Sequence, residues 1–208
     1  MDEMQLALFV IASFIIIITP GQDLLLVMSR AVTQGSRAGI ITASGVSIGL
    51  IGHSVLTAFG LGALLLASKS IFTILKFVGA GYLFYLGIRL ITSKSHRLDL
   101  KSSQKVSPRK LFFTGAFSNI SNPNITIFYF AFLPQFIPGN AENPTLQLLI
   151  LGLFFAFLTF LVKGPVGYFA GILSLWLRSN PKILKWIDRT SGTVLIGLGI
   201  KLVFEQPP

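Results

Sequence analysis

The sequence predicts an all-α integral membrane protein with six transmembrane helices arranged as a 3+3 inverted repeat. Three observations lead to this fold class: the composition, the placement of basic residues and the recurrence of one motif. Of the 208 residues, 52% are hydrophobic and only 12% are charged, about half the charged fraction of an average soluble domain. The mean hydropathy is +0.76, and apolar stretches long enough to cross a bilayer recur along the chain.

Six apolar segments are predicted to span the membrane. They are residues 4–29, 39–67, 71–92, 111–133, 146–177 and 187–204. The first segment is too long for a cleaved signal peptide, and it lacks the basic start and small-residue end of one. The chain has no cysteine, which excludes disulfides and thiolate metal sites.

The net charge of +10 is unevenly distributed along the chain. Thirteen Lys and Arg residues fall on the side of segments 30–38, 93–110 and 178–186, whereas three fall on the opposite side. This asymmetry follows the positive-inside rule. It predicts a basic cytoplasmic loop over 93–110 and places both termini on the opposite side of the membrane, which is the periplasmic side if the membrane is a bacterial inner membrane. The basic charge therefore indicates orientation and no nucleic-acid partner.

A short motif recurs at the end of each half. "YLGIRL" at 85–90 returns as "GLGIKL" at 197–202, which is 112 residues further on. The motif could simply be a common way to end a membrane helix. With three spans per half, however, the second half is inverted relative to the first, as in many transporters. We therefore expect one repeat over 1–92 and a second over 111–208.

The first and fourth spans are interrupted by residues that break helices. The interruptions are Thr19-Pro20-Gly21 and Asn122-Pro123-Asn124. Broken helices at matching positions in two halves point to a substrate site, since each break exposes the N–H groups and positive dipole end of a new half-helix. Such ends suit a carboxylate, and Asp23 suits an ammonium group, so the expected ligand is an amino acid or a close relative. Alternatively, both prolines are packing kinks and Asp23 is a simple helix cap.

Two further polar residues lie deep inside predicted spans. Lys163 is too far from either end of the fifth span for its ammonium to reach an interface. We expect it to pair with Asp23 or to meet a substrate carboxylate. His53 could carry a proton during transport, because histidine changes charge near neutral pH. It could equally be hydrogen-bonded between packed helices.

The same residues resemble a known family. "TPGQDLLLV" (19–27), "GAGYLFYLGIRL" (79–90) and "NPNITIFYFAFLPQF" (122–136) are similar to segments of the LysE/RhtB family, bacterial exporters of amino acids and related compounds such as threonine, homoserine and leucine. The resemblance covers nearly the whole chain. It implies roles for Thr19, Pro20, Gly21 and Asp23 as parts of the family's T-P-G-P-(N/D) motif, and for Asn122 and Pro123 as parts of its N-P-K motif. Gln22 and Asn124 depart from these motifs, which weakens inference about the substrate.

The sequence contains no nucleotide-binding motif, no catalytic triad pattern and no metal-ligand cluster. We therefore expect neither an enzyme nor a cofactor. The expected function is secondary active export of amino acids or derivatives, by proton antiport with alternating access. The expected partners are the substrate, protons and the lipid bilayer, and a homo-oligomer is compatible with the sequence. The alternatives are an exporter or channel for another small solute or cation, and a non-transporting membrane scaffold.

Overall fold

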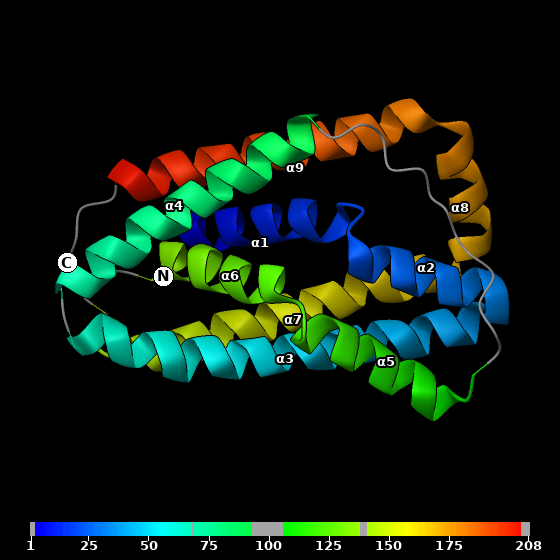
Figure 1. Ribbon diagram of the computed structural model, residues 1–208, viewed down its shortest axis with the longest axis horizontal. Coiled ribbons are helices and arrows are strands. Elements are labelled where there is room, and N and C mark those ends of the chain that lie inside the picture. Colours follow the sequence, from blue (N-terminus) through cyan, green and yellow to red (C-terminus); the bar gives the residue numbers. More distant parts are fainter. Residues whose placement is uncertain (1–2, 68, 93–105, 138–140, 205–208) are drawn as a thin grey trace.

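The computed structural model describes residues 3–67, 69–92, 106–137 and 141–204 (Figure 1). Within these residues the chain is helical apart from short connections. The helices are α1 (Glu3–Ile18), α2 (Gln22–Gln34), α3 (Ser36–Ala67), α4 (Lys69–Thr92), α5 (Pro108–Ile120), α6 (Pro123–Phe132), the 3-10 turn η1 (Leu133–Phe136), α7 (Pro144–Tyr168), α8 (Ala170–Ser179) and α9 (Pro181–Phe204).

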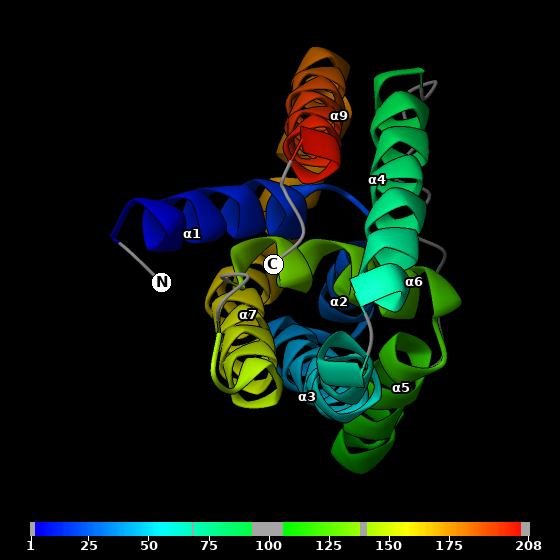
Figure 2. The same ribbon diagram turned by 90° about the vertical axis from the view of Figure 1, so that its left-hand side faces the viewer.

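Most of the helices run along the long axis of the molecule, and α8 lies across one end (Figure 1). The start of α1 and the end of α9 lie toward the opposite end. Viewed along the long axis, α4 and α9 form one layer and α3, α5 and α7 form another (Figure 2). Helices α1, α2 and α6 lie between these layers, so both helix breaks also lie between them, with Gly21 and Ser121 exposed.

Two of the described helices are long and apolar enough to cross a membrane, namely α3 over Ser36–Leu61 and α7. Helices α1 and α2 meet at a bend of 54° and make a third candidate when they are counted as one span. The described residues thus hold two or three candidate spans by length and composition, and the six predicted spans are not confirmed. Helices α5 and α6 are short, Phe77–Thr92 of α4 counts as a shorter apolar helix, and α9 begins with several charged residues.

Both predicted helix breaks are present. The backbone is non-helical from Thr19 to Gly21, and again at Ser121 and Asn122. Proline fits the first turn of a helix, where its missing N–H has no partner to lose, so α6 begins at Pro123. The second break is therefore shorter than the predicted interruption.

Two helix ends differ from the predicted spans. The fifth span was expected to continue to residue 177, but α7 ends at Tyr168 and α8 turns away across the molecule. Ala170, the first residue of α8, is buried in a cluster with Leu24 and Met28 of α2. This apolar contact stabilises the turn between α7 and α8. Helix α5 begins at Pro108, inside the predicted loop 93–110. The Ser107 hydroxyl caps it by accepting a hydrogen bond from the Lys110 backbone N–H at 3.4 Å.

Close approach of helices at glycines sets the packing around the breaks. A Cβ atom added to Gly39 of α3 would lie 2.6 Å from the carbonyl oxygen of Gly167 in α7. One added to Gly115 of α5 would lie 2.5 Å from the carbonyl oxygen of Thr42 in α3. Small residues let membrane helices pack with their backbones in contact. Helix α3 is thereby held directly against both α5 and α7, which carry the polar residues described next.

Candidate functional site

Asp23 and Lys163 form a buried ion pair at the start of α2. The Lys163 Nζ of α7 lies 3.4 Å from the Asp23 Oδ2, and each side chain is only 10% exposed. Desolvating two charges is costly, and their attraction offsets this only when the remaining polar atoms find partners. The other carboxylate oxygen of Asp23, Oδ1, is buried without a hydrogen-bond partner. The pair therefore keeps an acceptor that is free to bind a further donor.

Asn119 completes the group around the carboxylate. Its side-chain Nδ2 donates a hydrogen bond to the Asp23 Oδ2 at 2.7 Å. Asn119 is fully buried in the last turn of α5, and its own Oδ1 also lacks a partner. The sequence interpretation missed this residue, although an asparagine inside an apolar segment just before a break was a usable signal.

The two helix breaks lie against each other. The Asn122 Nδ2, at the N-terminus of α6, donates to the Gln22 Oε1, at the N-terminus of α2, at 3.1 Å. The Asn122 Oδ1 also accepts from the Asn124 backbone N–H at 3.1 Å and so caps α6. The structure thus brings the positive ends of two half-helices together beside the ion pair.

His53 of α3 is buried and contacts α5 and α6 close to the ion pair. Its Nε2 is 3.0 Å from the backbone carbonyl oxygen of Asn119, and its Nδ1 is 3.3 Å from the Thr126 Oγ1. A carbonyl can only accept, so Nε2 carries a proton, and a neutral ring whose Nδ1 accepts from Thr126 satisfies both contacts. His53 therefore contacts the Asp23 group only through Asn119.

The remaining predicted polar residues contact α9 and α4. The Thr19 Oγ1 donates to the Ile15 carbonyl oxygen at 2.9 Å and is hydrogen-bonded to the Ser191 hydroxyl of α9. At the other break, the Tyr82 hydroxyl of α4 donates to the Asn124 carbonyl oxygen at 3.0 Å. The ion pair is formed by Asp23 and Lys163, and the backbone of Asn124 is bonded to α4 instead.

The predicted prolines and Gly21 carry no side-chain polar group, so they act through the backbone that they shape. Pro20 is buried, whereas Gly21 is exposed and precedes α2 as its N-cap. Pro123 occupies the first turn of α6. All three residues lie at the junction where α2 and α6 begin.

The arrangement is suited to reversible binding of a small charged solute. It combines a carboxylate with an unpartnered oxygen, an adjacent ammonium and two helix N-termini in a largely apolar surrounding. Ionisable residues and interrupted helices of this kind, set among apolar membrane-length helices, are features of membrane transport proteins. The fold and the site therefore define a membrane transport protein.

Comparison with known proteins gives the family. The family model described as LysE type translocator matches residues 14–206, and the chain belongs to that family. It is 33% identical over 205 residues to YrhP, an uncharacterized membrane protein of Bacillus subtilis (94% of this chain, 96% of the relative). It is 31% identical over 196 residues to a homoserine/homoserine lactone efflux protein of Salmonella typhimurium (93% of each), and 26% identical over 200 residues to a leucine efflux protein of an Enterobacter species (93% and 92%). No solved structure matches the chain. The predicted family resemblance is confirmed.

Proposed function

We propose that this protein is a secondary active exporter of an amino acid or an amino-acid derivative. The observation that carries the proposal is the buried Asp23–Lys163 pair, joined by Asn119 where two half-helices begin. In the proposed complex, the ammonium of the substrate binds the Asp23 carboxylate. The substrate carboxylate binds the N-termini of α2 and α6 and the ammonium of Lys163 that the substrate has displaced.

The names of the efflux relatives support this substrate class. Homoserine, homoserine lactone and leucine differ in their side chains and in whether they carry a free carboxylate. All three carry an α-amino group, which is the group that Asp23 would bind. We therefore propose that recognition of the amino group is the fixed part of the site, and that the pocket walls select the rest of the molecule.

The packing of α4 on α9 supports the proposed inverted repeat over 1–92 and 111–208. A Cβ added to Gly87 would lie 2.7 Å from the Gly192 carbonyl oxygen, and one added to Gly199 would lie 3.3 Å from the Ala80 carbonyl oxygen. Gly199 and Gly192 are each 112 residues beyond Gly87 and Ala80, respectively. The same contact thus occurs in both directions, as a two-fold axis requires.

We propose six membrane crossings with both termini periplasmic, following the positive-inside pattern. Single cysteines at Ser107 and Asn143 test this topology, because the chain has no native cysteine. A membrane-impermeant maleimide should label Asn143→Cys in intact cells and Ser107→Cys only in inside-out vesicles. Labelling of Ser107→Cys in intact cells would overturn the orientation.

We propose proton antiport as the energy source. The Asp23 carboxylate can hold Lys163, a substrate ammonium or a proton, but only one at a time. If proton binding and substrate binding exclude each other at this carboxylate, then proton entry drives substrate exit without a separate coupling device. Rocking of one half against the other would expose the site to each side in turn.

The test is accumulation of radiolabelled homoserine, threonine and leucine in inside-out vesicles. Asp23→Asn should abolish accumulation per unit of protein in the membrane, and Asp23→Asn/Lys163→Met, which leaves no buried charge unpaired, should be equally inactive. Glu142→Gln is the matched control, because Glu142 is exposed next to Asn143. Full accumulation by Asp23→Asn would refute the site, and flux only down a gradient would indicate a channel. A protonophore should stop uptake; uptake that survives it but requires sodium would refute proton coupling.

A further inference from the structure

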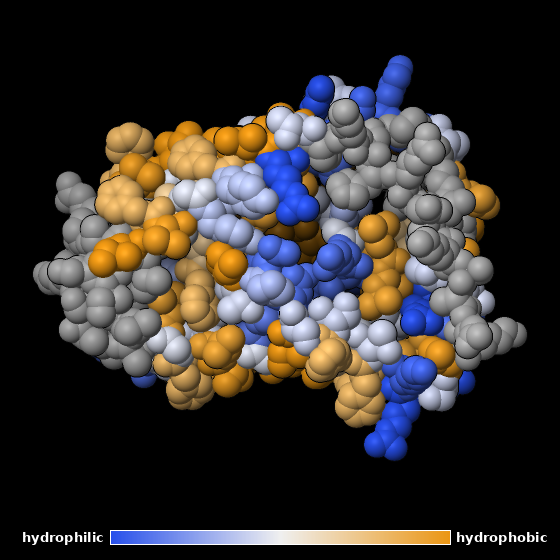
Figure 3. Space-filling model, in the orientation of Figure 1, coloured by the Kyte–Doolittle hydropathy of each residue, from blue (hydrophilic) through white to orange (hydrophobic). Residues whose placement is uncertain are grey.

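A hollow opens on one face of the molecule. Figure 3 shows it toward the viewer, with hydrophilic surface along part of its rim and hydrophobic surface at its floor. In the same orientation, the end of α4 and the starts of α2 and α6 lie around it (Figure 1). The starts of α2 and α6 carry Gln22 and Asn124, both exposed, and the half-buried Asn122. The buried Asp23 directly follows the exposed Gln22, so Asp23 is one residue along the chain from this rim.

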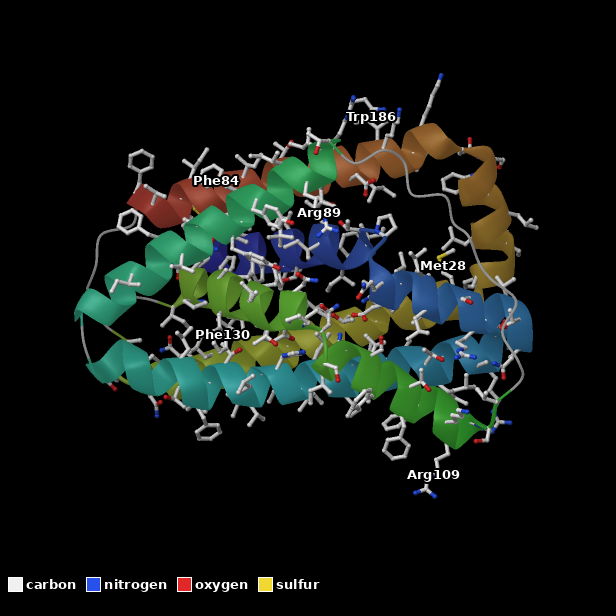
Figure 4. All side chains as sticks on the ribbon, in the orientation of Figure 1. Met28, Phe84, Arg89, Arg109, Phe130 and Trp186 are labelled. Atoms are coloured by element: carbon white, nitrogen blue, oxygen red, sulfur yellow. The ribbon has the colours of Figure 1, made fainter. Side chains whose placement is uncertain are left out.

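Arg89 lies at the rim of this hollow. Figure 4, drawn in the orientation of Figure 3, labels it near the end of α4. Arg89 is exposed and stands two helical turns beyond Tyr82 on the same face of α4. The Tyr82 hydroxyl in turn bonds to Asn124 at the start of α6. Arg89 and Tyr82 therefore lie on one face of α4, and Tyr82 ties that face to the junction of the two breaks.

Arg89 has no carboxylate partner in the described parts of the chain. There, the carboxylate of Asp23 is paired with Lys163, and no ion pair involves Arg89. A guanidinium presents a planar fork of donors that matches a carboxylate in two parallel hydrogen bonds. Deeper in the molecule lies the buried, unpartnered Asp23 Oδ1. A cation at the rim and a carboxylate inside, which a substrate ammonium can bind once it displaces Lys163, together match the two ends of a zwitterion.

We propose that Arg89 is a capture subsite for the carboxylate of the substrate, with Tyr82 and Gln22 as its polar neighbours. This inference rests on the proposed export function. By the basic-residue pattern, Arg89 belongs to the cytoplasmic side, which is where an exporter collects its substrate. The amino acid binds first through its carboxylate at the rim, and its ammonium then moves inward to displace Lys163 from Asp23.

The test compares substrates with and without a carboxylate in inside-out vesicles. The pairs are leucine with leucinamide, and homoserine with homoserine lactone; within each pair the α-amino group is kept. Arg89→Gln should raise the KM for leucine and homoserine about tenfold, near the lower end for a charge-assisted hydrogen bond. The KM for leucinamide and the lactone, and the maximal rates, should stay unchanged. Arg89→Lys should be intermediate, because it keeps the charge but loses the planar fork.

The matched control is Arg109→Gln. The Arg109 guanidinium lies over the Phe113 ring at 5.7 Å from its centroid, and Figure 4 shows it pointing away from the hollow. Equal KM changes for acids and amides, or equal effects of both variants, would overturn the subsite. An effect of Arg89→Gln that appears only in vesicles rich in anionic lipid would overturn it in favour of a headgroup anchor. Failure of the wild type to transport any of the four solutes would instead refute the proposed function.

Discussion

The imidazole Nε2 of His53 lies 3.0 Å from the backbone carbonyl oxygen of Asn119. In a continuous helix this carbonyl would accept from the N–H of residue 123, but residue 123 is a proline and has none. The Asn122 N–H reaches the carbonyl instead, at 2.9 Å, and His53 supplies a second donor. His53 thus holds the end of α5 in the position from which Asn119 reaches Asp23.

We predict that His53 positions the break and does not carry the transported proton. His53→Ala should destabilise the protein by about 1–3 kcal/mol, because it removes a partner from buried polar groups. His53→Gln, which restores an N–H donor, should recover much of that stability and keep the wild-type pH profile of transport. Thermal unfolding in detergent and uptake in vesicles over a range of pH measure the two effects. A folded His53→Gln protein without pH-dependent uptake would assign the proton to His53.

The ion pair yields a prediction about stability that is separate from transport. Lys163→Met should lower the membrane level and the stability of the protein, because breaking a buried pair costs about 3–5 kcal/mol. The double variant Asp23→Asn/Lys163→Met should regain most of the stability, since no buried charge is left unpaired, yet remain inactive. Membrane levels, detergent unfolding and uptake distinguish these outcomes. A single variant as stable as the double variant would show that the pair is solvated in the membrane.

Two helical glycines differ in what surrounds them. A Cβ atom on Gly45 would overlap the Phe112 carbonyl oxygen of α5, whereas one on Gly81 would meet nothing within 4 Å. We predict that Gly45→Ala destabilises the protein by about 1–3 kcal/mol through overpacking. Gly81→Ala should leave stability unchanged or raise it by up to about 1 kcal/mol, because alanine favours the helix. Equal melting temperatures for the two variants would contradict the close packing of α3 on α5.

The contact between Gln22 and Asn122 can be tested by cross-linking, because the chain has no cysteine of its own. We predict that a short bifunctional methanethiosulfonate reagent joins Gln22→Cys to Asn122→Cys, since the native Asn122 Nδ2 and Gln22 Oε1 lie 3.1 Å apart. Cross-linking should block transport and reduction should restore it, if the two halves move relative to each other. Mass spectrometry of tryptic peptides detects the bond. Gln22→Cys/Ser107→Cys is the control pair, and cross-linking of both pairs alike would indicate random collision.

Local chemistry explains what the sequence could predict. Proline and glycine decide backbone geometry within a few residues, so the breaks at Pro20 and before Pro123 were predictable. The pairing of Asp23 with Lys163 was one of two open expectations, and the two side chains lie within ion-pair distance. Two charges buried in apolar segments have few other ways to be neutralised.

Tertiary packing explains what the sequence could not predict. The segment before the second break, "FSNISNPN" (117–124), holds several polar residues. The orientation of α5 about its own axis decides which of these residues faces Asp23. The glycine contacts between α5 and α3 set that orientation. The end of α7 at Tyr168 could not be predicted either, because the residues that follow it are apolar and compatible with a helix. The chain turns there to bury Ala170 against α2.

The separation of Asp23 from its partners has a consequence for how the protein is made. Lys163 is 140 residues further along the chain, and Asn119 is 96 residues further. During synthesis, α2 therefore leaves the ribosome long before either partner exists. Until then its carboxylate faces lipid or the translocon without neutralisation, at a cost of a few kcal/mol. We therefore expect residues 1–92 to insert less stably until α7 is translated, and a truncated chain that ends before Lys163 to be degraded more readily, since its Asp23 carboxylate stays unpaired.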